Sequence, residues 1–128
     1  METTITQGIR VSVETFYQEK HSSPEEDRYV YAYRITIRNE GSETVQLMRR
    51  HWFIRDSNTM VREVEGEGVI GLQPVLEPGK HHEYISWTNL MSDIGKMNGV
   101  YTMQKISDGS EFEVEIPEFT MVAPFRLN

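Results

Sequence analysis

Residues 29–38 read YVYAYRITIR, and this stretch decides the fold class. Three tyrosines and two isoleucines occupy every second position. Of the five positions between and after them, Arg34, Thr36 and Arg38 are polar, and only Val30 and Ala32 are apolar. An alternation with a period of two residues predicts a half-buried β-strand. One apolar and one polar face is typical of an antiparallel sheet with one face on the core.

Further strand signals follow along the chain, separated by turn signals. Residues 9–17 and 81–88 alternate in the same way, residues 45–56 predict a strand that is apolar on both faces, and residues 60–65 predict a short one. Residues 20–28 predict a polar loop, and 39–42 and 56–59 predict turns. We expect residues 89–99 to be a loop with a single helical turn around Asp93.

The C-terminal part predicts a β-hairpin. Asp108-Gly109 is typical of a two-residue turn of the primed type. With this pair at the tip, Met103 lies opposite Val114 on a face that is apolar along both strands. Gln104 and Glu113 then face the solvent.

These elements predict a single all-β domain over residues 1–128. Between seven and nine short strands, with no helical period beyond one turn, indicate an immunoglobulin-like or fibronectin type III-like antiparallel β-sandwich. The length of 128 residues and the 38% of hydrophobic residues suit one two-layered domain.

Composition excludes several classes of function. Thirteen Lys and Arg against 20 Asp and Glu give a net charge of −7, which makes nucleic acid and anionic membranes poor partners. The absence of cysteine excludes disulfides, thiol catalysis and thiolate metal sites. No stretch is apolar enough for a signal core or a membrane span, so we expect a cytoplasmic protein without membrane insertion.

The string Gly66-Glu67-Gly68-Val69-Ile70-Gly71 matches the G-x-G-x-x-G pattern of dinucleotide-binding folds. That pattern works where it opens a helix whose N-terminal amides hold a pyrophosphate. Gln73, Pro74 and Pro78 follow at once, so no helix can begin here, and no Gly-Lys-Ser/Thr of a P-loop is present. We therefore expect an irregular edge segment whose glycines permit positive φ or a bulge.

The only concentrated basic patch is Arg49-Arg50-His51-Trp52. Arginine forks could bind a phosphate or a carboxylate. On a regular strand, however, Arg49 and His51 face one way and Arg50 the other, so the cations converge only if a bulge intervenes. We favour cations that pair with the abundant carboxylates. Three apolar residues of the strand then face the core: Met48, Trp52 and Ile54.

The remaining histidines and carboxylates predict no catalytic or metal centre. His81 and His82 are adjacent in a strand, so their side chains diverge, and the acidic loop around His21 lacks the spacing of a calcium loop. No nucleophile elbow and no H-E-x-x-H motif is present. We predict no enzyme, no catalytic residue, no metal ligand and no cofactor.

Seven segments of the sequence resemble the ApaG family, also called the domain of unknown function 525, almost from end to end. They are YVYAYRITIRN at 29–39, QLMRRHW at 46–52, GEGVIGLQP at 66–74, LEPG at 76–79, YIS at 84–86, GKMNGVYTM at 95–103 and IPEF at 116–119. The resemblance implies a fibronectin type III-like sandwich. Bacterial members are named from a gene neighbourhood shared with a diadenosine tetraphosphate hydrolase, and they are linked to tolerance of cobalt and magnesium. Similar domains occur in eukaryotic F-box proteins and in a polymerase δ-interacting protein, where protein binding is the suspected role.

Two hypotheses about function follow. The first is a non-enzymatic protein-interaction module with an unidentified protein partner, or a homodimer, recruited through an edge strand. The alternative is a binder of a phosphate-bearing molecule or a divalent cation. Its candidate ligand-binding residues are Arg49, Arg50, His51, Gly66, Glu67, Gly68 and Gly71.

Overall fold

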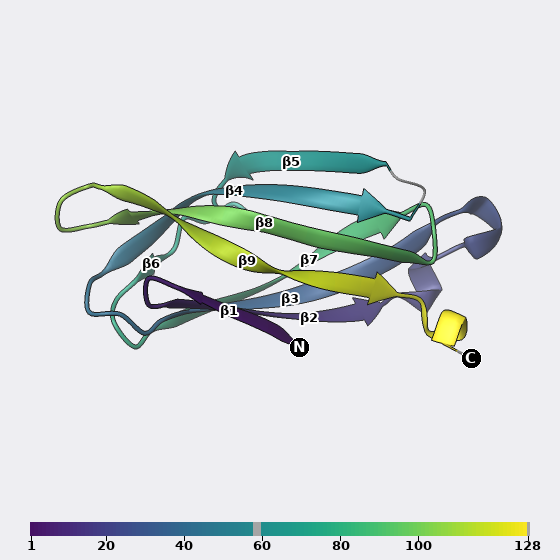
Figure 1. The fold of residues 1–128 in the computed structure, drawn as a ribbon, viewed down its shortest axis with the longest axis horizontal. Coiled ribbons are helices and arrows are strands. Elements are labelled where there is room, and N and C mark those ends of the chain that lie inside the picture. The colour runs from purple at the N-terminus through teal and green to yellow at the C-terminus, as the bar shows by residue number, and fades with distance from the viewer. Residues whose placement is uncertain (58–59, 128) are drawn as a thin grey trace.

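The computed structural model describes residues 1–57 and 60–127. This part of the chain contains nine strands in two antiparallel sheets (Figure 1). The four-stranded sheet contains, in spatial order, β1 (Glu2–Thr6), β2 (Ile9–Tyr17), β3 (Tyr29–Asn39) and β7 (His81–Leu90). The five-stranded sheet contains β5 (Val61–Glu67), β4 (Val45–Asp56), β8 (Ile94–Lys105) and β9 (Glu111–Val122), with the two-residue β6 (Val75–Leu76) also paired to β4. Three short 3₁₀ turns complete the fold: η1 (Glu19–His21), η2 (Pro24–Glu26) and η3 (Pro124–Leu127). The prediction of an all-β sandwich of seven to nine strands is confirmed.

The core lies between the two sheets, where alternate residues of each strand point inward. On β3, Tyr31, Tyr33, Ile35 and Ile37 are at most 5% exposed, as their alternation predicts, and Tyr29 is half-buried. They face the apolar positions of β4, β8 and β9. No helix among the described residues has the length and apolarity to cross a membrane.

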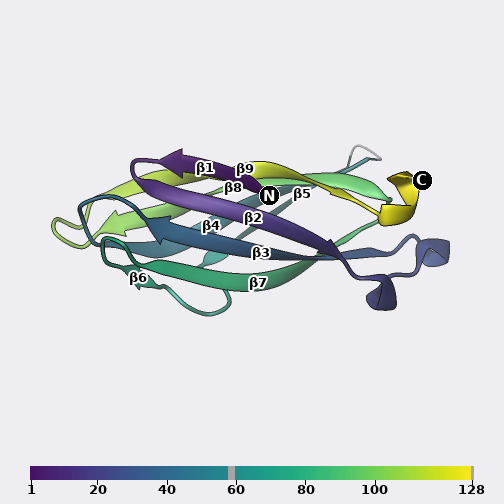
Figure 2. The ribbon, with the colours of Figure 1, turned by 90° about the horizontal axis from the view of Figure 1, so that it is seen from below.

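One side of the sandwich is closed and the other is open, as the two views show (Figures 1 and 2). On the closed side β1 lies beside β9, because the Thr4 hydroxyl donates to the Glu115 carbonyl at 2.9 Å and the Glu115 amide donates to the Thr6 hydroxyl at 3.2 Å. On the other side the edges of the two sheets are β5 and β7. The sequence reading missed β1, which pairs with β2 through a turn with positive φ at Gln7 and Gly8.

The predicted register of the C-terminal hairpin is wrong by two residues. Met103 pairs with Phe112 rather than with Val114, and the strands are joined by residues 106–109 instead of a two-residue turn. A primed type I turn needs positive φ at both central residues, whereas only Gly109 of the Asp108-Gly109 pair has it. A shift of two residues preserves the faces of a strand, so Met103 and Val114 are buried as predicted and Glu113 is exposed.

The predicted loop at 89–99 is also wrong, since β7 continues to Leu90 and β8 begins at Ile94, with no helical turn between them. The glycines of this stretch allow close packing of strands. A Cβ on Gly99 would lie 2.2 Å from the His51 carbonyl oxygen on β4. Of the turn predicted at 56–59, residues 58 and 59 lie outside the described residues.

A β-bulge in β4 decides which side chains of this strand reach the core. Its pairing to β8 shifts between Leu47 and Arg49, so Leu47 is fully buried and Met48 is only partly buried. The expectation that Met48 shares the core face with Trp52 and Ile54 is therefore wrong, because a bulge inverts the alternation on one side of it. Trp52 and Ile54 are buried as expected.

The glycine string is irregular edge backbone followed by no helix, as predicted. It begins within the end of β5, continues into a tight turn at 69–72 and is followed by β6. Gly68, at a φ of 61°, needs to be glycine because a Cβ would lie 2.1 Å from the Leu72 carbonyl oxygen.

Candidate functional site

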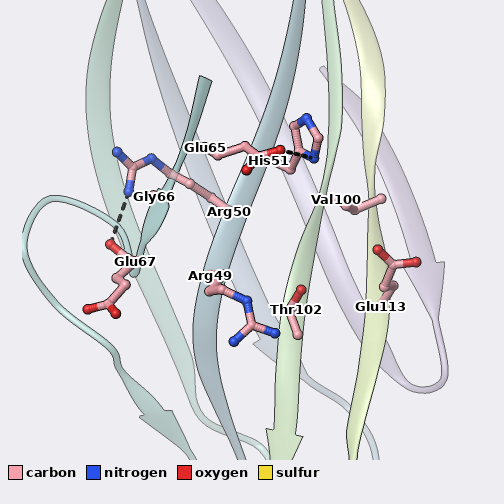
Figure 3. Close-up of a pocket in the computed structure, with 9 residues that line it drawn as sticks. All are labelled: Arg49, Arg50, His51, Glu65, Gly66, Glu67, Val100, Thr102 and Glu113. Atoms are coloured by element: carbon pink, nitrogen blue, oxygen red, sulfur yellow. Dashed lines mark hydrogen bonds and ion pairs between the residues drawn. The ribbon is translucent and has the colours of Figure 1, made fainter. Parts of the chain in front are cut away.

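A shallow hollow of about 400 Å³ lies on the outer face of the five-stranded sheet and brings most of the predicted ligand residues together (Figure 3). Its lining residues are Arg49, Arg50, His51, Glu65, Gly66, Glu67, Val100, Thr102 and Glu113. Five of the seven candidates are among them. Gly68 follows directly in the chain, whereas Gly71 lies in the tight turn and does not line the hollow.

The two arginines diverge, as the alternation of a strand predicts. Arg49 crosses the outer face and pairs with Glu111 at 3.0 Å, whereas Arg50 runs toward the end of β5 (Figure 3). There Nη1 of Arg50 donates to the Glu67 and Gly68 carbonyls at 3.0 and 2.9 Å. A Cβ on Gly66 would lie 2.8 Å from the Arg50 guanidinium. Gly66 therefore leaves room for an arginine that holds the following turn.

The amides of the glycine string do not converge on an anion. The Gly68 amide donates to the Met48 carbonyl at 2.9 Å, and the amides of Val69 and Leu72 donate to each other's carbonyls. The hollow also presents three carboxylates, on Glu65, Glu67 and Glu113. A phosphate here would meet negative charge and arginines that already have partners, so the geometry does not favour a phosphate-bearing ligand.

His51 occupies the outer face of β4 between two carboxylates of β5. Its Nε2 lies 3.3 Å from Oε2 of Glu63, and its Nδ1 lies 3.2 Å from Oε1 of Glu65. The imidazole stacks on the Phe53 ring with centroids 4.5 Å apart and planes at 24°. These three side chains are of the type that binds metal ions, and one ligand atom from each lies within 4.8 Å of the other two.

The sequence reading missed Glu63 and Glu65 as neighbours of His51. Metal ligands were sought only among the residues close to each histidine in the chain. The signal was present in the alternation of Glu63, Glu65 and Glu67, which places three carboxylates on one face of the strand that follows β4.

A second surface, on the outer face of the four-stranded sheet, carries exposed apolar side chains. Phe16, Ala32 and Trp87 are paired across β2, β3 and β7, and Ile85 stands two residues before Trp87 on β7. Phe16, Trp87 and Ile85 are 42%, 50% and 55% exposed, whereas Ala32 between Phe16 and Trp87 is 5% exposed. We call these four residues the Phe16–Trp87 patch. The sequence indicates this patch only through apolar residues at positions of β2, β3 and β7 that alternate with the core residues.

Two neighbouring side chains order the aromatic rings of this patch. The Arg34 guanidinium carbon lies 5.3 Å from the centroid of the Phe16 ring, a cation–π arrangement, and Arg34 also pairs with Glu14 at 2.9 Å. The His21 ring meets Trp87 edge-on at 5.2 Å. The patch therefore presents rings whose orientation is already restricted before any partner binds.

The interior of the sandwich contains a hydrogen-bonded pair of tyrosines. Tyr84 and Tyr101 hydrogen-bond to each other through their hydroxyls inside the core. Burial raises the pKa of both phenols well above the ordinary value, so both are neutral at physiological pH. A buried neutral pair of this kind offers no activated nucleophile.

Comparison with known proteins gives consistent matches. The ApaG domain family (DUF525) matches residues 19–105. A protein named ApaG from Brucella abortus is 52% identical over 124 residues, which cover 97% of this chain and 95% of that protein. One from Brucella anthropi is 53% identical over 120 residues, covering 94% and 92%. A crystal structure named as that of ApaA from Bordetella pertussis superposes with a TM-score of 0.88 at 42% identity, covering 91% of this chain and 94% of that one.

Proposed function

The chain belongs to the ApaG family, and from this membership and the exposed Phe16–Trp87 patch we propose that it is a non-enzymatic protein-interaction module. The partner is a cytoplasmic protein that docks on the outer face of the four-stranded sheet. Patches of this kind on a sheet face mark binding sites, because apolar surface that stays in water costs free energy.

The composition of the patch supports this proposal. Tryptophan and arginine are the residues that most often dominate binding energy at interfaces, and here Trp87 and Arg34 lie on one sheet face with Phe16. Burial of apolar surface contributes roughly 25 cal/mol per Å². Rings that Arg34 and His21 already orient lose less conformational entropy on binding than free side chains.

The edge of the sheet suggests how a partner could extend the contact. β7 carries Ile85 and Trp87 and is the last strand of its sheet. A partner strand added to β7 would gain backbone hydrogen bonds, while its side chains meet the patch. A second copy of this chain could pair in the same way, and this homodimer is the alternative occupant.

The absence of catalysis is part of the proposal. Its support is that Arg49, Arg50 and His51, the basic patch that the sequence suggested as a ligand site, are each engaged with a carboxylate or carbonyl. The links to cobalt and magnesium tolerance and to diadenosine tetraphosphate that the family resemblance implies stay predictions. Of the two small-ligand classes, the carboxylates around the hollow favour a cation over a phosphate.

The experiment compares proteins captured from lysate at native salt by the unmodified tagged chain and by three variants of it. Trp87→Ser and Phe16→Ser remove the aromatic rings, and Val75→Ser is a matched control, because Val75 is also apolar and 53% exposed but lies in β6 on the other sheet. Thermal unfolding checks that all three are folded.

We expect a partner that the unmodified chain and the Val75→Ser control capture alike and that both aromatic variants lose. Sedimentation that shows self-association abolished by the same two changes would identify a second copy as the occupant. The proposed docking face is wrong if the aromatic variants retain every partner of the unmodified chain.

A further inference from the structure

We propose that His51, Glu63 and Glu65 form an open binding site for a divalent transition-metal ion of the Zn²⁺ type. The three side chains lie on the outer face of the five-stranded sheet, and the Phe16–Trp87 patch lies on the other sheet. The inference is therefore independent of the proposed protein-binding function, and either can fail alone.

The backbone holds the three ligands in place. His51 on β4 pairs directly with Glu65 on β5, and the next outward pair along the same two strands is Phe53 with Glu63. Glu63 and Glu65 thus stand two residues apart on one strand and flank the imidazole. The Phe53 ring, stacked on His51, restricts rotation of the imidazole about its side-chain bonds.

The distance between His51 and Glu63 suits a tetrahedral ion. Zn²⁺ binds imidazole nitrogen and carboxylate oxygen at about 2.0–2.2 Å, which puts neighbouring ligand atoms of a tetrahedron roughly 3.3–3.6 Å apart. The Nε2 atom of His51 and Oε2 of Glu63 are 3.3 Å apart. The Glu65 carboxylate now lies beside Nδ1, and because its side chain is 67% exposed it is free to rotate toward the same ion. Three protein ligands leave the remaining position for water.

Electrostatics favours a cation at this point. Among the described residues, no lysine or arginine forms an ion pair with Glu63 or Glu65, and His51 is their only ion-pair partner. Glu67 and Glu113 add negative charge to the same face, where the nearby cation Arg49 is paired with Glu111. The neutral imidazole that binds a metal cannot neutralise two carboxylates, whereas a divalent ion can.

The ligand set also predicts which metal binds. Imidazole nitrogen suits Zn²⁺ and its transition-metal neighbours, whereas Mg²⁺ prefers an octahedral shell of oxygen atoms and keeps its water. Zn²⁺ should therefore bind through His51, and Mg²⁺ should not compete at similar concentration.

The experiment titrates the ¹⁵N-labelled chain with ZnCl₂ and follows the imidazole nitrogens of each histidine by NMR, with affinity measured against a fluorescent chelator. The variants are His51→Asn, Glu63→Gln and Glu65→Gln. The matched controls are Glu115→Gln, an exposed glutamate of β9 that does not line the hollow, and His81→Asn, an exposed histidine of β7. Since Glu63 and Glu65 are exposed, their glutamine variants should fold even if His51→Asn does not.

We expect one Zn²⁺ to shift the His51 nitrogen signals, with affinity weakened about tenfold or more in each of the three variants and unchanged in both controls. Mg²⁺ should leave His51 unshifted. Equal Zn²⁺ affinity in the variants, shifts at His81 instead of His51, or His51 nitrogen signals that Zn²⁺ leaves unshifted would each overturn the proposal.

Discussion

A disulfide introduced between Thr102 and Glu113 tests the hairpin register, which is where the sequence and the structure disagree. The structure pairs these two residues, whereas the turn expected from Asp108-Gly109 pairs Glu113 with Gln104. The chain contains no cysteine, so the only thiols in Thr102→Cys/Glu113→Cys are the two that are introduced.

Geometry favours this disulfide strongly. The Lys105 amide donates to the Ser110 carbonyl at 2.8 Å, which makes 105 and 110 a hydrogen-bonded pair. Alternation along the ladder then makes Thr102 and Glu113 a non-hydrogen-bonded pair, with Cα atoms about 4.5 Å apart. That separation is within the range of natural disulfides. Gln104 and Glu113 are diagonal neighbours about 7–8 Å apart, which is too far.

The expected stabilisation can be worked out from the loop that is closed. Residues 102 to 113 form a loop of about a dozen residues, for which loss of unfolded-chain entropy gives about 3 kcal/mol. In a domain of this size that raises the midpoint of thermal unfolding by roughly 10 °C. Urea unfolding of the oxidised and reduced forms measures the difference directly.

Two results would refute this reasoning. The first is ready formation of a disulfide in Gln104→Cys/Glu113→Cys while Thr102→Cys/Glu113→Cys stays reduced, which would support the register predicted from the two-residue turn. A disulfide that forms between 102 and 113 without stabilising the chain would show that the unfolded chain already keeps this hairpin partly formed, so that the crosslink removes little entropy.

Four further predictions concern stability and binding. Val114→Asp should destabilise the chain by at least about 3 kcal/mol through a buried unpaired charge, whereas exposed Glu113→Lys should change stability by less than about 0.5 kcal/mol; equal effects in urea unfolding would contradict the assignment of faces. Gly99→Ala should cost about 1–3 kcal/mol, since its Cβ meets the backbone of β4, and an unchanged urea midpoint would show that β8 can move away. The pKa of His82 is lowered in the folded chain, first by burial and second by the charge of the neighbouring His81. The unfolded chain therefore binds a proton at His82 more tightly than the folded chain does. As a result, the folded state loses stability as pH falls below about 6.5. His82→Gln should therefore lose less stability than the unmodified chain between about pH 7.5 and 5.5, and identical losses would count against this. ADP and diadenosine tetraphosphate at moderate salt should give no saturable amide shifts over residues 66–71, and saturation at micromolar ligand would restore the nucleotide hypothesis.

The candidate site shows why sequence reasoning succeeded in part. The opposite directions of Arg49 and Arg50 follow from alternation on one strand, and the lack of a helix after the glycine string follows from the prolines there. Both arguments use neighbours in the chain. The carboxylates beside His51 come from β5, and their position depends on the pairing of two strands, which no local pattern specifies.

The register and the bulges also required the tertiary structure. Leu47 replaces Met48 in the core because the pairing of β4 with β8 contains a bulge, and glycines at 95 and 99 belong to a strand because a neighbouring backbone occupies the space of a side chain. Asn39 was predicted only as a turn residue. It is 1% exposed, and its amide donates to the carbonyls of Glu43 and Leu76, which ties β3 to β6.

The sequence by itself determined that this protein is an antiparallel sandwich, which side chains of β2 and β3 form its core, and which family it resembles. These follow from period-two alternation and turn residues, which are local. The tertiary structure alone decided the closure of one side by β1, the exposed Phe16–Trp87 patch and the meeting of His51 with two glutamates. Each of these depends on which strands lie side by side, and that is set by packing of the whole chain rather than by the preferences of any one segment.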